Sequence, residues 1–139
     1  MHLYRIILFF PLLLGLACQN GPDPVKLLQD EVIAVHDEVM PQMGTMVKMK
    51  KALQARADGM IAQEADSTAL TSIYEAIANL EQADREMMQW MRDFSPPSAE
   101  MEQEKALAYL RDEMTKITAV KEKSFAGLEQ AKSILELNE

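Results

Sequence analysis

Residues 87–98, MMQWMRDFSPPS, divide this chain into helices. Met87, Met91 and Phe94 are three or four residues apart, which is the spacing of one helical face. The pair Pro96-Pro97 then interrupts the pattern, because proline lacks the backbone N–H that a helix interior requires. The serines on both sides of this pair are typical of a stop and a restart. The stretch therefore predicts a helix that ends at residue 94 and another that begins at residue 98.

Proline is absent between residues 42 and 95 and after Pro97, so long helices can form on both sides of the break. Asp23-Pro24 is typical of a helix start, and residues 64–67 form a weaker break. Three helices are expected, over about residues 24–63, 67–94 and 98–137. Short connections make neighbouring helices antiparallel. The predicted fold is all-α: an up-down-up bundle of three long antiparallel coiled-coil-like helices.

Each predicted helix carries one apolar stripe with spacings of three and four residues, which places the stripes in a shared core. The first stripe consists of Val25, Leu28, Val32, Val35, Val39, Met46, Met49, Leu53 and Met60. The second consists of Leu70, Ile73, Ile77, Leu80, Met87, Met91 and Phe94. The third consists of Leu107, Leu110, Met114, Ile117, Leu128, Ala131 and Leu135. In the third stripe, Lys121 and Ser124 are expected to leave a polar gap.

Pro41 lies inside the first predicted helix, and Gly44 follows three residues later. Proline at this position removes the hydrogen bond to the carbonyl of Asp37 and costs about 3 kcal/mol in a regular helix. Two structures satisfy this constraint: a helix that is kinked at Pro41, or a break that makes 24–40 a separate helix. We favour the kink.

Pairing the helices across their turns leaves two overhangs. Residues 24–36 are expected to project past the second helix, and residues 126–137 past its other end. Each overhang is apolar on one face, and an amphipathic helix without a neighbour is marginal in water. We therefore expect a protein partner or a homo-oligomer to cover these overhangs. The residues concerned are Val25, Leu28, Val32 and Val35 on one side and Leu128, Ile134 and Leu135 on the other.

The N-terminus differs in composition from the rest of the chain. The whole chain is 48% apolar and 26% charged, with a net charge of −8. Thirteen of the first 17 residues are apolar and only Arg5 is charged. This combination is typical of a secretory signal, whereas a membrane-spanning helix needs roughly 20 apolar residues and would not contain Pro11.

The end of this leader, Gly15-Leu16-Ala17-Cys18, resembles the lipobox of bacterial lipoproteins. The resemblance implies cleavage before Cys18 and lipidation of its thiol, with a plain secretory signal as the alternative. Gln19 follows the cysteine, and in such lipoproteins a residue other than Asp there implies sorting to the outer membrane. The expected organisation is a lipoprotein signal peptide (1–17), a lipidated Cys18 with its tether (18–23) and a helical bundle domain (24–139). The expected location is the cell envelope, as an outer-membrane lipoprotein that faces the periplasm or the surface.

The composition argues against two classes of function. An acidic chain without a basic stripe is unsuited to binding nucleic acid. An enzyme is not expected either, because His36 is the only histidine beyond residue 2 and Cys18 is the only cysteine. No Ser-His-Asp set, glycine-rich phosphate loop or thiol nucleophile can be assembled from these residues. No catalytic residue and no cofactor are therefore predicted.

Methionine is the unusual residue of this sequence, with 11 in the chain. Thioethers are soft ligands for Cu(I) or Ag(I), and an envelope location makes copper a chemically sensible metal for them to bind. His36, Met40 and Met43 fall on about 60° of one helical face, and Met87 and Met91 are expected at the same end of the bundle. A soft-metal site at these five residues is the alternative function, but methionine packed in a core or an interface is the more ordinary explanation.

Three segments resemble a group of small bacterial helical envelope lipoproteins, some of which are called "viral A-type inclusion protein". They are HDEVMPQMGTMVKMKK at residues 36–51, MMQWMRDF at 87–94 and the AxxYL run at 106–110. The resemblance implies a helical fold and an envelope location but no activity. The expected function is that of a lipid-anchored, non-catalytic helical module for binding or structural support.

Overall fold

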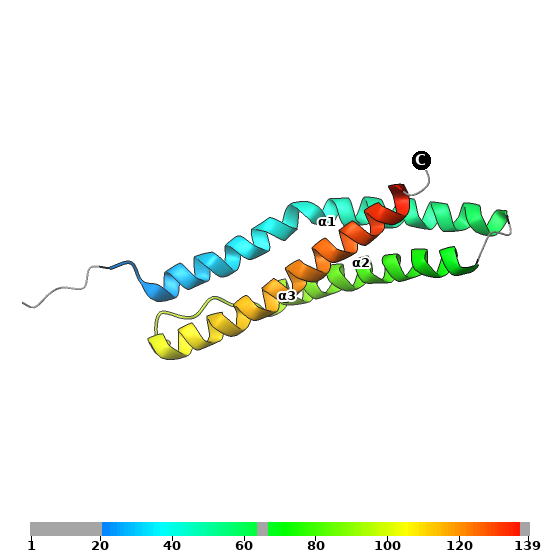
Figure 1. Cartoon of the computed structure of the whole chain (residues 1–139). Helices are drawn as coiled ribbons and strands as arrows, with labels where there is room; N and C mark the ends of the chain where they lie inside the picture. Colours follow the sequence, from blue (N-terminus) through cyan, green and yellow to red (C-terminus); the bar gives the residue numbers. More distant parts are fainter. Residues whose placement is uncertain (1–20, 64–66, 137–139) are drawn as a thin grey trace, which may run out of the picture.

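The computed structural model describes residues 21–63 and 67–136, and within these ranges the chain is helical with no strand. The three helices are α1 (Pro24–Ala62), α2 (Ser67–Asp93) and α3 (Gln103–Glu136). Every helix packs against the other two. Figure 1 shows α2 running antiparallel to α1, and α3 returning in the direction of α1. The predicted all-α, up-down-up bundle is confirmed.

Buried residues recur every seven positions in all three helices, which is the repeat of a coiled coil. In α1 the fully buried series is Val32, Val39, Met46 and Leu53. In α2 two series seven residues apart are buried, Ile73, Leu80, Met87 and Ala76, Ala83, Trp90. In α3 the two series are Ala106, Glu113, Val120, Gly127 and Leu110, Ile117, Ser124, Ala131. The seven-residue repeat in α1 runs through Pro41 without a change of phase.

The core has two parts of different composition. One part, which we call the aromatic end, lies around the start of α1 and the end of α2; its buried members are Val32, Val39, Met87, Trp90, Leu110, Ile117 and Val120. The other part, the alanine-rich end, contains Met46, Leu53, Ala57, Ile73, Ala76, Ile77, Leu80, Ala83, Leu128 and Ala131. Met43 packs against both parts.

α3 begins at Gln103, five residues later than the predicted start at residue 98. The chain from Phe94 to Glu102 is not helical, and its one local backbone bond joins the N–H of Met101 to the carbonyl of Ser98 at 3.0 Å. Figure 1 shows this connection running on past the end of α2 before α3 turns back. The prolines therefore do more than stop one helix, because the extended segment that contains them displaces the start of the next.

This displacement removes the two overhangs that the sequence predicts. α3 starts beyond the end of α2, so its first turns lie beside the start of α1, where Val32 and Leu110 are both fully buried. At the other end, Leu128 is only 7% exposed, within the alanine-rich core. Within the described residues, the prediction that 24–36 and 126–137 have no neighbouring helix is wrong, because it assumed a tight turn at the proline pair.

α1 is one continuous helix from Pro24 to Ala62, with Pro41 inside it. Figure 1 shows α1 changing direction near its middle, as expected for a proline kink. The alternative of a separate helix over 24–40 is excluded. The predicted N-cap is also present, since the Asp23 carboxylate accepts a hydrogen bond from the N–H of Val25 at 2.9 Å.

Ser124 is fully buried and continues the α3 seam, so the predicted polar gap at this residue is wrong. Its hydroxyl donates to the carbonyl of Val120 at 2.8 Å, which satisfies the buried polar group within its own helix. Gly127, which has no side chain, lies close to Leu80 of α2. A Cβ atom on Gly127 would lie 3.3 Å from Cδ2 of Leu80.

Candidate functional site

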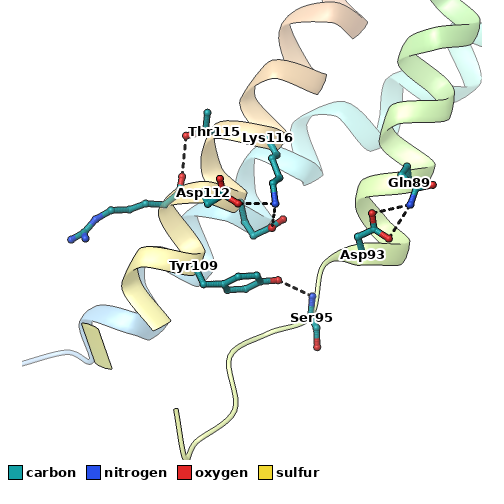
Figure 2. Close-up of polar contacts among 9 residues, drawn as sticks. Gln89, Asp93, Ser95, Tyr109, Asp112, Thr115 and Lys116 are labelled. Atoms are coloured by element: carbon teal, nitrogen blue, oxygen red, sulfur yellow. Dashed lines mark hydrogen bonds and ion pairs between the residues drawn. The ribbon is translucent and has the colours of Figure 1, made fainter. Parts of the chain in front are cut away.

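The aromatic end brings together four rings from all three helices. The ring centroids of His36 and Trp90 are 5.6 Å apart, those of Trp90 and Phe94 are 4.8 Å apart, and those of Phe94 and Tyr109 are 6.4 Å apart. The Tyr109 hydroxyl accepts a hydrogen bond from the N–H of Ser95 at 3.1 Å (Figure 2). This row of rings ties the start of the connection to α3 and holds Trp90 in place.

A groove between α2 and α3 adjoins these rings. It encloses about 320 Å³. Trp90, Ala119 and Val120 form its apolar part, and five polar side chains surround them. The polar residues are Glu86, Gln89, Asp93, Glu113 and Lys116.

Glu113 is the most unusual residue of this groove. It occupies a core position of the α3 seven-residue repeat, and the whole residue is only 4% exposed. Its carboxylate accepts a hydrogen bond from Nζ of Lys116 at 2.8 Å. Removing a carboxylate from water is costly even when it is paired, and an apolar residue of similar size is often the more stable choice at such a position. Glu113 therefore indicates a requirement other than packing.

Lys116 is held between two carboxylates. Its Nζ lies 2.7 Å from the carboxylate of Asp112 and 2.8 Å from that of Glu113. Figure 2 shows Lys116 pointing toward Asp112. The hydrogen bond to Asp112, followed by that to Glu113, raises the pKa of Lys116 above its usual range. The ammonium is therefore charged at every physiological pH, and both neighbouring carboxylates compete for it.

On the α2 side, the acidic residues of the groove are fixed by local partners. Gln89 donates to both oxygens of Asp93, at 2.9 and 2.8 Å (Figure 2). Glu86 accepts a hydrogen bond from Lys123 at 2.6 Å, and this bond is the main cause that lowers the pKa of Glu86. The groove thus presents three carboxylates, of which Glu113 pairs with Lys116 and Glu86 pairs with Lys123, so that Asp93 is the one without an ammonium partner among the described residues.

Trp90 contributes a polar atom without a partner. Its Nε1 is buried, and no hydrogen-bond acceptor lies within reach among the described residues. A buried indole N–H normally has a partner, because leaving it unpaired costs roughly 1–3 kcal/mol. The unpaired donor and the buried carboxylate of Glu113 both belong to residues that line the same groove.

The five residues predicted as soft-metal ligands are only partly gathered. Met87 is fully buried in the aromatic end, Met43 and Met91 pack against it, and His36 lies against Trp90. Met40 is 37% exposed. Nδ1 of His36 lies 2.9 Å from a carboxylate oxygen of Asp37. Within the described parts of the chain, no group of three or more His, Cys, Asp or Glu residues is arranged to hold a metal ion.

Sequence reasoning missed Glu113 and the groove. The signal was present, since Ala106, Glu113, Val120 and Gly127 are seven residues apart, but small and charged residues do not stand out as an apolar stripe. The predicted α3 stripe was therefore shifted toward its large residues, and Leu107, Met114 and Leu135 are in fact only half-buried.

The predicted leader and the lipidated Cys18 lie outside the described residues. Within residues 21–63 and 67–136, no helix has both the length and the apolar character needed to cross a membrane. No protein-family model, curated protein or solved structure was found that matches this chain.

Proposed function

We propose that this protein is a lipid-anchored binding module of the cell envelope, with no catalytic role, and that it binds its partner in the groove between α2 and α3. The leader pattern that ends at Cys18 supports the anchor, and residues 18–23 are the tether. The observation that carries the binding role is the buried Glu113 in a core position of a groove that is also lined by Trp90, whose indole N–H is unpaired among the described residues.

The ligand that suits this groove is a cationic group on an apolar stem, such as a lysine or arginine side chain of a protein partner. The stem would lie on the apolar surface of Trp90 and Val120. The cation would meet the carboxylates of Glu86, Asp93 and Glu113, which outnumber the ammoniums of Lys116 and Lys123. A net charge of −8 also favours a basic partner by long-range attraction.

Trp90 provides the readout, because it is the only tryptophan in the chain. Hexylammonium is a suitable probe and hexanol its uncharged control, since the two share one apolar stem. Titration of the mature protein with hexylammonium is expected to change the Trp90 fluorescence saturably in the millimolar range, as befits a very small ligand. An equal response to hexanol, or no saturable response, contradicts the proposed cation site.

The role of Glu113 is tested by Glu113→Leu, with Glu122→Leu as the matched control on an exposed position of α3. Glu113→Leu is expected to abolish the hexylammonium response while the helical content is unchanged, whereas Glu122→Leu keeps the response. The anchor is tested separately by mass spectrometry of the mature N-terminus. An unmodified Cys18 contradicts the lipoprotein part of the proposal and leaves the groove unaffected.

A soft-metal function is the second candidate. It is favoured by the placement of Met43, Met87, Met91 and His36 at or against one cluster. Calorimetric titration with Cu(I) distinguishes it from the first, and binding weaker than micromolar rejects it. Replacing both Met87 and Met91 with leucine, which conserves side-chain volume, is expected to remove copper binding without unfolding the bundle.

A further inference from the structure

The outer face of α1 carries a second apolar stripe beside the one in the core. Met40, Val47 and Ile61 are 37%, 45% and 54% exposed. They are seven and fourteen residues apart, so they lie along one line of the helix. Met40 and Val47 each follow directly after a residue of the core series, and Val47 borders a shallow depression between α1 and α2 that also includes Lys50 and Glu81. This stripe is not covered by any described part of the chain.

Gly44 lies in the middle of this face. Glycine in a helix interior costs roughly 1 kcal/mol relative to alanine. At position 127 the structure explains the use of glycine, because a Cβ atom there would press on Leu80. A Cβ atom on Gly44 would meet nothing within 4 Å. The same is true of Gly59, so the described part of the chain requires glycine at neither position, and at Gly44 the missing side chain leaves room for a helix that approaches from outside.

The charges of α1 change sign on either side of Gly44. Residues 24–38 contain four carboxylates and one lysine, and residues 45–58 contain four basic side chains and one aspartate. Asp37 and Lys51 are the members that matter most, because they are seven residues before and seven residues after Gly44 and so share its face. Both are exposed. Among the described residues, Lys51 has no ion-pair partner and Asp37 contacts only His36.

We propose that this face binds a second copy of the chain, with the two α1 helices antiparallel about a two-fold axis at Gly44. In that arrangement the two Gly44 residues meet at the axis, and the missing side chains let the helices approach closely. Asp37 of each copy lies opposite Lys51 of the other, so the contact contains two equivalent ion pairs. Met40 of each copy packs near Val47 of the other. A two-fold contact has to be self-complementary in this way. The sequence of α1 on the two sides of Gly44 meets this requirement.

Disulfide trapping tests the axis directly. A disulfide requires Cβ atoms about 3.5–4.5 Å apart, which two copies of one residue achieve only near a two-fold axis. In the full chain with Cys18 replaced by serine, so that the introduced thiol is the only one, Gly44→Cys is expected to form a covalent dimer under mild oxidation. Glu122→Cys, on an exposed position of α3, is the matched control and is expected to remain monomeric. Equal trapping of both variants, or a covalent product of Gly44→Cys with a different protein, overturns the proposal.

Charge reversal tests the register. In the Gly44→Cys background, Asp37→Lys or Lys51→Asp alone places like charges opposite each other twice, and trapping is expected to fall about tenfold. The double variant Asp37→Lys with Lys51→Asp restores both ion pairs and is expected to restore trapping. Because both positions are exposed, helical content is expected to be unchanged. Single reversals without effect, or a double variant that fails to recover while it is fully helical, overturn the antiparallel arrangement.

Discussion

The aromatic end and the alanine-rich end are built on one seven-residue repeat but differ in the size and polarity of their buried side chains. At the alanine-rich end, Ala76, Ala83 and Ala131 are fully buried, and Gly127 brings α3 into contact with α2. At the aromatic end, Trp90 replaces the small residue, and Glu113 lies in the α3 seam. The first arrangement fills its interior mainly with small and aliphatic side chains. The second places a tryptophan and a buried carboxylate along one groove. The same repeat therefore accommodates two interiors of different size and polarity.

The largest expected effect is the loss of a side chain from the alanine-rich end. Leu53→Ala removes a fully buried side chain from closely packed helices, which relax little, so we expect a loss of about 2–5 kcal/mol in the free energy of unfolding. Leu27→Ala is the control, since Leu27 is 47% exposed, and its effect should be within about 0.5 kcal/mol. Thermal unfolding followed by circular dichroism measures both. Equal losses would remove the distinction between a tight core and a free surface.

At the aromatic end, the corresponding change should stabilise the protein. Glu113→Leu replaces a buried carboxylate with an apolar side chain of similar size, and we expect a gain of about 1–4 kcal/mol. Lys116 keeps Asp112 as a partner, so the substitution leaves no isolated charge. Glu122→Leu on the exposed face should change stability by less than about 0.5 kcal/mol. A clear loss of stability in Glu113→Leu would mean that Glu113 serves packing and not binding.

Two of the three helical glycines, Gly44 and Gly127, test the comparison with smaller expected effects. Gly44→Ala has open space around the new Cβ and should stabilise the isolated chain by about 0.5–1 kcal/mol. Gly127→Ala gains the same helix propensity but presses on Leu80 in a filled interior, so it should be less stable than Gly44→Ala by about 1 kcal/mol or more. Denaturant titration at low protein concentration compares the two variants. Equal gains in the free energy of unfolding would show that the alanine-rich end can accommodate an additional methyl group.

The smallest effect is the pH dependence of the Glu86 ion pair. Lys123 lowers the pKa of Glu86 in the folded protein below its ordinary value of 4.5. A depressed pKa stabilises the fold fully above that ordinary value, and the contribution is lost as the pH falls through the folded pKa. Glu86→Gln should therefore be less stable than the parent by about 0.2–1 kcal/mol at pH 7, and the difference should vanish in acid. A difference that persists unchanged well below pH 4 would contradict this.

The sequence was sufficient for the helices because their signals are local. Asp23-Pro24 marks the start of α1, and the proline pair marks the end of α2 within one residue of the observed end at Asp93. The stripe of α1 also faces the core as predicted, with Val32, Val39, Met46 and Leu53 buried. Valine, methionine and leucine at that spacing are seldom left in water. The start of α3 was less accurate, because nothing between residues 98 and 102 forbids a helix. The length of the non-helical connection depends on how far the chain must extend before α3 can pack against the other two helices.

Sequence alone determined that this chain forms three long amphipathic helices, because hydrophobic periodicity and proline act over a few residues. Tertiary structure decided which helix covers which apolar face. The extended connection moved α3 along the bundle, buried both predicted overhangs and left the outer stripe of α1 exposed instead. It also placed Glu113 beside Trp90, two residues that are 23 positions apart in the chain. Such pairings depend on how far one helix is shifted along another, and the sequence of a single helix does not determine that shift.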